Sequence, residues 1–222
     1  MIKRLVFDVD GTLISQCDYV SVVTRVLTKI GKYSDENAEK LLFGVMTYEN
    51  HFNFYDKNLF IKYLSVVMGI KLNKLDIEIL KEEFEKCIPP QNEHLKNTIE
   101  KLSEKYELVV LTNFFTKLQK NRLDNMGIGE YFKHIYGEDI IKPNPLAYIK
   151  ACGENKPSEC VMIGDNIETD IKGAKKAGLK TILVNTKKKD ADKIDTLYVR
   201  RIEDLNEIII DRLDKNCNDL ER

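Results

Sequence analysis

Two carboxylates stand two positions apart near the N-terminus, where Asp8 and Asp10 follow the apolar run "LVF" and precede Gly11. Because side chains alternate along an extended chain, both carboxylates point to the same side while Val9 points away. Two carboxylates held this close repel each other and raise each other's pKa unless a cation lies between them. A few oxygen ligands, completed by waters and a substrate phosphate, suit Mg²⁺ better than zinc. The pair therefore predicts a site for a divalent cation.

Polar residues also end other apolar runs of the chain. Thr112 and Asn113 end the run "ELVVLTN", and Asp165 ends the run "CVMIGD". In an open α/β sheet, ligands bind beyond the carboxyl ends of the strands. We therefore expect these residues to belong to the same site as Asp8 and Asp10.

The elements that would position these residues are visible as apolar patterns. Four short runs predict β-strands, at residues 4–8, 107–113, 160–165 and 180–185. Their uninterrupted apolar character is typical of strands buried on both faces, as in a parallel sheet. Helical patterns lie between them, and Gly127 and Gly178 each end one. Strand, helix and strand in repetition predict right-handed crossovers and an α/β fold.

The segment 15–92 interrupts this order, because it contains four successive helical patterns and no convincing strand. Ser34 is a candidate N-cap for the second pattern, and Pro89-Pro90 closes the fourth. We interpret the segment as an inserted α-helical domain. The α/β domain is then predicted to consist of residues 1–14 and 93–222.

The composition argues against several classes of function. The 222 residues include 35 basic and 36 acidic ones, so the net charge of −1 shows no bias toward nucleic acid or an anionic membrane. The basic run 187–189 is interpreted as a solvated loop. The N-terminal apolar run is too short for a secretory signal, and no apolar stretch approaches the ~18 residues of a membrane span. We therefore expect a cytoplasmic location.

The cysteine, histidine and aromatic residues are expected to be structural. The five cysteines are odd in number, widely spaced and free of CxxC pairs, so we expect neither a disulfide framework nor a zinc site. His51, His94 and His134 are not spaced as a metal cluster and are expected at the surface or at helix caps. The aromatic segment 43–56 is expected to pack within the helical domain or against the sheet, with a substrate-facing surface as the alternative.

Four motifs follow one another along the chain: "DVDGT" (8–12), "LTN" (111–113), "KPNP" (142–145) and "GDNIETD" (164–170). Each stands at the end of a predicted strand or at the start of a predicted helix. With these motifs in this order, the chain resembles the haloacid dehalogenase superfamily, in its phosphatase branch, over nearly its whole length. The resemblance implies a Rossmann-like parallel sheet, and it makes the helical insertion the mobile cap of the family.

The resemblance also implies which groups react. Asp8 matches the nucleophile, which attacks phosphorus and forms an aspartyl phosphate. Asp10 matches the general acid and base, which protonates the leaving oxygen and then takes a proton from the hydrolytic water. Lys142 matches the lysine that offsets the charge of the nucleophile and the phosphoryl group. Gly11 and Thr12 match positions whose backbone N–H groups approach the phosphoryl oxygens.

Two further residues match the substrate-binding set of the family. Thr112 matches the hydroxyl donor to the transferring phosphoryl group, and Asn113 stands beside it. One position departs from the family pattern, since relatives often carry aspartate where this chain has Asn144. We expect that change to affect supporting hydrogen bonds and not the reaction.

The implied cofactor is Mg²⁺. The resemblance assigns it to the carboxylates of Asp8 and Asp165 and to the main-chain carbonyl of Asp10. Asp170 is expected to orient Lys142 or a metal-bound water.

These matches imply a Mg²⁺-dependent phosphohydrolase that acts on a small phosphorylated metabolite through an aspartyl-phosphate intermediate. A phosphomutase of the β-phosphoglucomutase type is the first alternative, because it shares all four motifs and the cap. A hydrolytic dehalogenase is disfavoured, because those relatives lack an acid at the position of Asp10. A binding protein on a decayed scaffold is also disfavoured, because a pure binder needs no nucleophile. No exposed heptad pattern predicts an oligomer.

Overall fold

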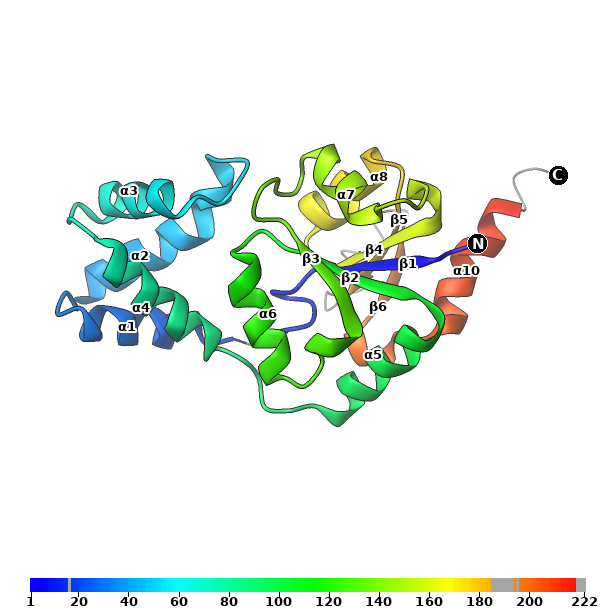
Figure 1. The fold of residues 1–222 in the computed structure, drawn as a ribbon, viewed down its shortest axis with the longest axis horizontal. Coiled ribbons are helices and arrows are strands. Elements are labelled where there is room, and N and C mark those ends of the chain that lie inside the picture. The colour runs from blue at the N-terminus through cyan, green and yellow to red at the C-terminus, as the bar shows by residue number, and fades with distance from the viewer. Residues whose placement is uncertain (16, 185–193, 195, 219–222) are drawn as a thin grey trace.

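One parallel sheet forms the centre of the computed structural model, which describes residues 1–15, 17–184, 194 and 196–218. Its strands follow the order β3-β2-β1-β4-β5-β6, and every neighbouring pair is parallel (Figure 1). The strands are β1 (Arg4–Phe7), β2 (Glu107–Leu111), β3 (Phe132–Tyr136), β4 (Cys160–Gly164), β5 (Lys180–Val184) and β6 (Leu197–Val199). The predicted α/β fold is therefore confirmed, while the basic run 187–189 lies outside the described residues.

The four predicted strands are β1, β2, β4 and β5, which are buried along nearly their whole length. The sequence prediction missed β3 and β6, which form the two edges of the sheet. Lys133 and His134 of β3 are exposed, and β6 has three residues. Neither edge strand has the continuous apolar run that reveals a strand covered on both faces.

Helices cover both faces of the sheet. The helices of this part are α5 (Glu93–Lys105), α6 (Thr116–Asn125), α7 (Pro145–Cys152), α8 (Gly173–Lys176) and α10 (Glu207–Asn218). Phe7 of β1 packs in one cluster with Ile99 of α5 and Ile210 of α10, whereas Val6 packs in another with Tyr148 of α7. This division follows from the alternation of side chains along a strand. Within the described residues, no helix has both the length and the apolar character needed to cross a membrane.

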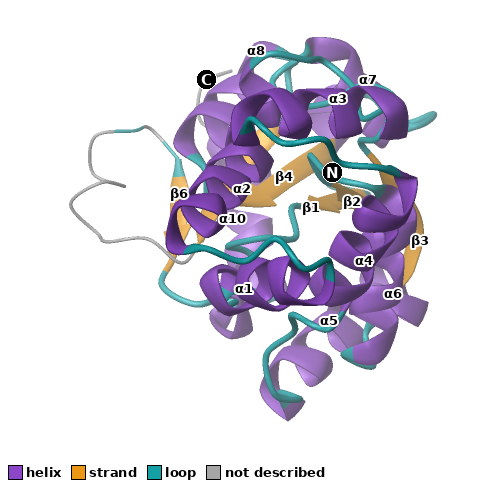
Figure 2. Ribbon diagram, turned by 90° about the vertical axis from the view of Figure 1, so that its left-hand side faces the viewer, coloured by secondary structure: helices purple, strands orange, loops and turns teal. Residues whose placement is uncertain are grey.

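Four helices between β1 and α5 form a separate layer, which we call the helical unit. They are α1 (Tyr19–Lys29), α2 (Asp35–Thr47), α3 (Lys57–Met68) and α4 (Lys74–Glu85). Each begins at a side chain that accepts a backbone N–H of the first turn, namely Asp18, Ser34, Asp56 and Asn73. The apolar core of this unit continues into Phe114, Phe115 and Leu118 beside the sheet. Figure 2, in which the helical unit faces the viewer, shows the strands behind it.

A disulfide joins the two chain segments that connect the helical unit to the sheet. Cys17 precedes α1, Cys87 follows α4, and 70 positions separate them in the sequence. The expectation that the cysteines form no disulfide was therefore wrong. The two ends of an insertion must meet where it leaves its parent domain, and this proximity has no signature in the spacing of the cysteines. Cys152 and Cys160 are buried and unpaired, as expected for core residues.

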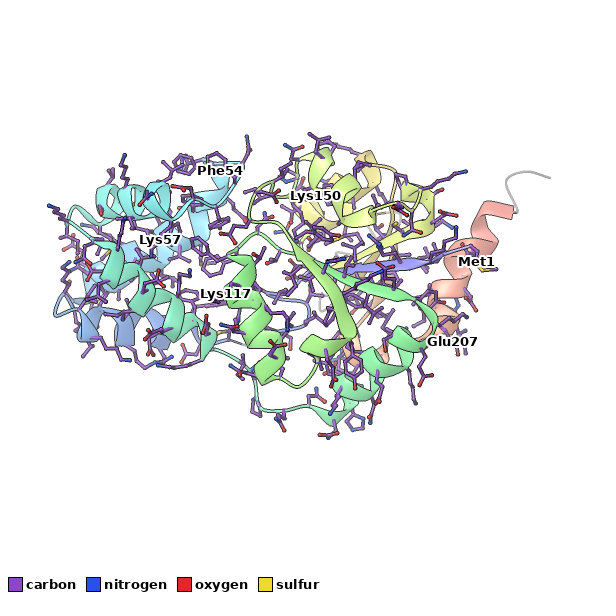
Figure 3. All side chains as sticks on the ribbon, viewed as in Figure 1. Met1, Phe54, Lys57, Lys117, Lys150 and Glu207 are labelled. Atoms are coloured by element: carbon purple, nitrogen blue, oxygen red, sulfur yellow. A yellow bond between two sulfur atoms is a disulfide. The ribbon has the colours of Figure 1, made fainter. Side chains whose placement is uncertain are left out.

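A shallow cleft marks the junction of the helical unit and the sheet domain. Phe54, between α2 and α3, and Lys150, on α7, both line it (Figure 3). Lys150 is ion-paired with Asp139. Tyr55 lies between this cleft and the cavity described below, because it lines both.

Candidate active site

Three polar side chains follow three neighbouring strands: Asp8 follows β1, Thr112 follows β2 and Asp165 follows β4. Because β1 lies between the other two strands and all three are parallel, these residues lie together at the carboxyl ends of the strands, which we call the carboxyl edge of the sheet. β1 runs from the N-terminus toward the helical unit, so this edge faces that unit (Figure 1). A cavity of about 320 Å³ lies there, and its lining includes Asp8, Asp10, Gly11, Thr112, Asn113, Lys142, Asp165 and Asp170. The predicted site residues thus meet in one place; Thr12 does not line the cavity, but its hydroxyl lies 3.5 Å from Oδ1 of Asp165.

The backbone N–H groups of Gly11 and Thr12 make hydrogen bonds within the turn that follows Asp10. The backbone N–H of Gly11 donates to the carbonyl of Ile14, and that of Thr12 donates to the carbonyl of Val9. The expectation that these N–H groups approach a phosphoryl group is therefore corrected, because the turn uses them for its own hydrogen bonds. Gly11 has a φ of 88°, and a Cβ at this position would overlap the carboxylate of Asp165. Glycine is needed here so that the turn can pass close to that carboxylate.

Lys142 is buried between two carboxylates. Its Nζ donates to Oδ1 of Asp8 and to Oδ1 of Asp170, both at 2.6 Å, and its side chain is 3% exposed. Burial lowers the pKa of Lys142, but the charges of Asp170 and Asp8 outweigh this effect and raise it well above its usual value. Asn113 holds the Lys142 backbone, since its amide donates to the carbonyl (2.9 Å) and accepts from the N–H (2.8 Å). The ammonium is therefore positioned beside the Asp8 carboxylate.

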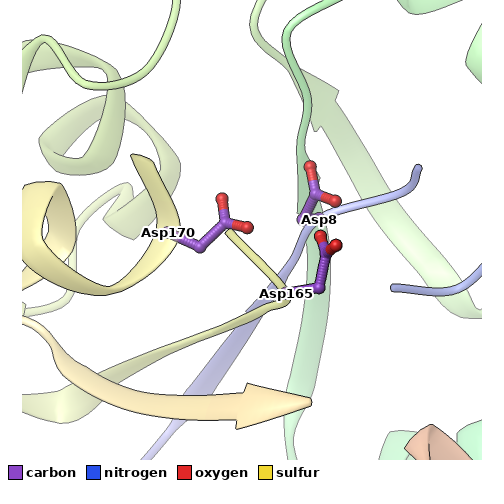
Figure 4. Close-up of side chains that lie close together, drawn as sticks. All are labelled: Asp8, Asp165 and Asp170. Atoms are coloured by element: carbon purple, nitrogen blue, oxygen red, sulfur yellow. The ribbon is translucent and has the colours of Figure 1, made fainter. Parts of the chain in front are cut away.

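Asp8, Asp165 and Asp170 form a compact carboxylate cluster, with one oxygen of each within 4.8 Å of the others (Figure 4). The pKa of Asp8 is well above its usual value. Burial and the charges of the two neighbouring carboxylates raise this pKa more than Lys142 lowers it. Burial and the charge of Asp170 raise the pKa of Asp165 to about 6. Lys142 offsets one of these three negative charges. The uncompensated charge and the oxygen-only donor set fit a divalent cation such as Mg²⁺.

Asp10 lies on the same cavity but belongs to a separate hydrogen-bond network. Its carboxylate accepts from the hydroxyl of Tyr19 (2.6 Å), from Nε2 of Gln119 (2.7 Å) and from Nη1 of Arg122 (2.7 Å). Burial raises the pKa of Asp10, but the charge of Arg122 and these hydrogen bonds outweigh it and lower the pKa below its usual value. Asp10 is therefore ionised in this conformation. Gln119 also donates to Oγ1 of Thr112 (3.0 Å), so the hydroxyl proton of Thr112 is free to point elsewhere.

The sequence interpretation missed Gln119 and Arg122. Both are fully buried on α6, on the side of the helix that also carries Leu118 and Leu123. Polar residues at core-facing positions of a helix need partners, because burying an unpaired charge costs several kcal/mol, on the order of 3–5. Two polar residues at core-facing positions of a predicted helix could therefore have indicated a buried polar partner. Tyr19 of α1 has both an apolar and a polar contact, since its ring stacks on Phe84 at 5.8 Å while its hydroxyl donates to Asp10.

The other residues discussed in the sequence analysis cap a helix, lie at the surface or contribute to packing. Asn144 is the N-cap of α7 and accepts from the N–H of Leu146 at 3.0 Å, a role that asparagine and aspartate share. The three histidines at 51, 94 and 134 are exposed. The aromatic segment 43–56 packs in part, since the buried ring of Tyr48 contacts Phe52, Tyr55, Phe60 and Tyr63. Phe43 and Phe54 are exposed, and Tyr55 also lines the cavity, as the alternative of a substrate-facing surface implies.

The helical unit supplies the opposite wall of the cavity. This wall is mostly apolar and is lined by Tyr19, Leu42, Val45, Met46, Tyr55 and Phe84, together with Glu49. Glu49 lies in the short turn η1 (Tyr48–Asn50), between α2 and α3. Burial raises the pKa of Glu49, while a hydrogen bond from Asn113 and the charge of Lys142 lower it, and its net pKa is above the usual value. The cavity is therefore polar at the sheet and apolar with one carboxylate at the helical unit.

Known proteins resemble this chain in sequence and in fold. A family model described as haloacid dehalogenase-like hydrolase matches residues 2–178. A glyceraldehyde 3-phosphate phosphatase of Methanothermobacter thermautotrophicus is 27% identical over 234 residues, which cover 94% of this chain and 100% of that protein. The HAD-hydrolase YfnB of Bacillus subtilis, solved with bound magnesium, has a TM-score of 0.68 at 22% identity, covering 94% of this chain and 98% of that one. A HAD phosphatase of Thermococcus onnurineus has a TM-score of 0.66 at 26% identity, with the same two coverages.

Proposed function

Because this chain belongs to the haloacid dehalogenase-like hydrolases, we propose that it is a phosphohydrolase that releases phosphate from small phosphorylated metabolites with the help of Mg²⁺. One observation carries the proposal: the Asp8 carboxylate lies at 2.6 Å from a buried ammonium and beside the Asp165 carboxylate, at the edge of the sheet. A buried carboxylate with a fixed cation beside it suits nucleophilic attack on a phosphate ester. The phosphatases among its relatives support this choice of reaction.

In the first half of the reaction, an oxygen of Asp8 attacks phosphorus. The bond from phosphorus to the ester oxygen breaks, and the carboxylate becomes an aspartyl phosphate. Lys142 offsets negative charge on the nucleophile and the phosphoryl group. The Thr112 hydroxyl, which accepts from Gln119, donates a hydrogen bond to a phosphoryl oxygen. Asp8, Asp165 and the main-chain carbonyl of Asp10 would hold Mg²⁺, whose charge would reduce the repulsion between the phosphate and these carboxylates.

Asp10 acts as the general acid and the general base. It donates a proton to the leaving ester oxygen, and in the second half it takes a proton from the water that attacks the aspartyl phosphate. The ionised form held by Tyr19 and Arg122 is the form that accepts this proton. The acid role requires the Asp10 side chain to leave these partners and take up a proton.

We propose that the helical unit acts as a cap. In this assignment residues 15–92 form the cap, and residues 1–14 and 93–222 form the core. The apolar wall of the unit would cover the organic half of the substrate and exclude water during phosphoryl transfer.

A phosphate-release assay over phosphorylated metabolites tests this function. We expect phosphate release with Mg²⁺, loss of release in excess chelator, and at least a 1,000-fold loss in the variant Asp8→Asn with an unchanged circular dichroism spectrum. Release of phosphate without isomer formation would separate hydrolysis from a phosphomutase reaction. Turnover at a normal rate by Asp8→Asn would contradict the covalent mechanism.

A further inference from the structure

The cation content of the cavity limits the charge of the substrate. Lys142 is the lysine among the described lining residues, and no arginine or histidine of the described chain joins it there. Its ammonium is already shared by Asp8 and Asp170 at 2.6 Å each. Arg122, the nearby guanidinium, is fully buried and pairs with Asp10. The described wall thus offers no cation to a second phosphate or carboxylate of a substrate.

The negative charges in the cavity reinforce this limit. Lys142 and a bound Mg²⁺ together offset the three carboxylates of Asp8, Asp165 and Asp170. Two negatively charged groups are then left without a compensating cation, namely the dianionic phosphate of the substrate and the carboxylate of Glu49. A further anion on the substrate would face Glu49 across an apolar wall, where charges repel more strongly than in water.

Glu49 is held in place by a hydrogen bond from Asn113 and by the burial of the residue that precedes it. The preceding residue, Tyr48, is fully buried, with its ring 4.9 Å from that of Phe60 and 4.7 Å from that of Tyr55. An ionised carboxylate accepts hydrogen bonds and donates none. It therefore matches the hydroxyl groups of a substrate and mismatches a carboxylate or a phosphate. The surrounding wall of Leu42, Val45 and Met46 is apolar, which favours an uncharged group over an ammonium that would lose its water.

We infer that this site selects monophosphate esters whose organic half is uncharged and carries hydroxyl groups, and that Glu49 binds one of these hydroxyl groups. The inference rests on the proposed function and adds the class of substrate to it. It makes Glu49 a residue that determines specificity, contributed by the helical unit and not by the sheet.

Two matched substrate pairs test the inference. Glycerol 3-phosphate and 3-phosphoglycerate differ by the replacement of a CH₂OH group with a carboxylate, and so do 2-hydroxyethyl phosphate and phosphoglycolate. We expect kcat/KM to favour the uncharged member of each pair by at least tenfold, which corresponds to about 1.4 kcal/mol. Phosphoethanolamine adds a cationic comparison and is expected to be a poorer substrate than 2-hydroxyethyl phosphate.

Two variants assign the preference to Glu49. Glu49→Gln keeps the size of the side chain and removes its charge, so we expect the ratio within each pair to fall at least threefold. Glu36→Gln is the matched control, because Glu36 is 74% exposed on α2 and pairs with Lys40 at the surface. We expect this control to leave the ratios unchanged.

The outcomes separate the inference from the proposed function. Equal or reversed preference within the pairs, an unchanged ratio in Glu49→Gln, or a preference for phosphoethanolamine would overturn the inference. Release of phosphate from p-nitrophenyl phosphate but from none of the uncharged hydroxyl esters would overturn it as well, while the proposed function would stand. Absence of release from every ester, p-nitrophenyl phosphate included, would overturn both.

Discussion

Replacement of Arg122 by methionine is expected to destabilise the protein by about 3 kcal/mol. The Arg122 side chain is 1% exposed and donates to Asp10 (2.7 Å), to Oε1 of Gln119 (2.9 Å) and to the carbonyl of Cys87 (2.8 Å from Nη2). Methionine occupies a similar volume and donates no hydrogen bond. The substitution would leave the Asp10 carboxylate without a cation and the Cys87 carbonyl without its donor.

The magnitude follows from these contacts. Removing one partner of a buried ion pair costs about 3–5 kcal/mol. Because the Asp10 side chain is 35% exposed, water compensates for part of this loss, and we expect about 2 kcal/mol from the ion pair. The carbonyl of Cys87 adds about 1 kcal/mol.

Urea unfolding followed by circular dichroism at pH 7 measures this change. Lys120→Met, on the same helix, is the control, because Lys120 pairs with Asp124 at the surface and its loss should cost less than about 0.5 kcal/mol. If the uncompensated Asp10 charge is the cause, the double variant Asp10→Asn/Arg122→Met should lose less than the sum of the two single variants. A loss below about 1 kcal/mol in Arg122→Met, or strict additivity in the double variant, would refute this reasoning.

Three further predictions concern Gly11 in the turn after β1, the hydroxyl of Thr112, and Glu83 in the helical unit. Gly11→Ala is expected to lower kcat at least tenfold, because its Cβ would displace the Asp165 carboxylate, and steady-state kinetics with Mg²⁺ measures this. Thr112→Val is expected to lower kcat by about 10- to 100-fold, whereas Thr112→Ser should retain most activity; equal losses in both would argue against a hydroxyl role. Burial raises the pKa of Glu83, but hydrogen bonds from Lys29, Lys86 and Arg25 outweigh it and lower the pKa to about 2. The ionised form thus stabilises the fold above pH 4.5, and this stability is lost as the pH falls toward 2; between pH 5 and pH 3 the wild type should lose about 2 kcal/mol more than Glu83→Gln in urea unfolding.

The parts of the fold that the sequence predicted are those with a local signal. The strands β1, β2, β4 and β5 have uninterrupted apolar runs because helices cover them on both faces. The four helices of the helical unit have regular apolar stripes and capping side chains. The edge strands β3 and β6 were missed, because each pairs on one side only among the described residues and their apolar pattern is short or broken.

The reacting residues could be predicted because parallel strands all end at the same edge of the sheet. Asp8 and Asp165 each follow the last residue of a strand, so the topology that brings the strands together also brings the carboxylates together. The roles assigned to them and to Lys142 stay predictions until the variants are measured. Membership of the family, by contrast, was predicted from the four motifs and is confirmed.

The α/β fold, the helical insertion and the meeting of Asp8 and Asp165 at the carboxyl ends of the strands could be predicted from the sequence, because each of these depends on local patterns or on parallel strands. Lys142 was assigned to the site by the resemblance of its motif to the family, since it follows β3, a strand that the apolar pattern did not reveal. The partners of Asp10, the Cys17–Cys87 disulfide and the place of Glu49 in the cavity depend on contacts between distant parts of the chain. Arg122 is 112 positions from Asp10, and Cys87 is 70 from Cys17. Contacts across such separations depend on how α6 and the helical unit dock on the sheet, and docking is decided by the packing of many side chains at once.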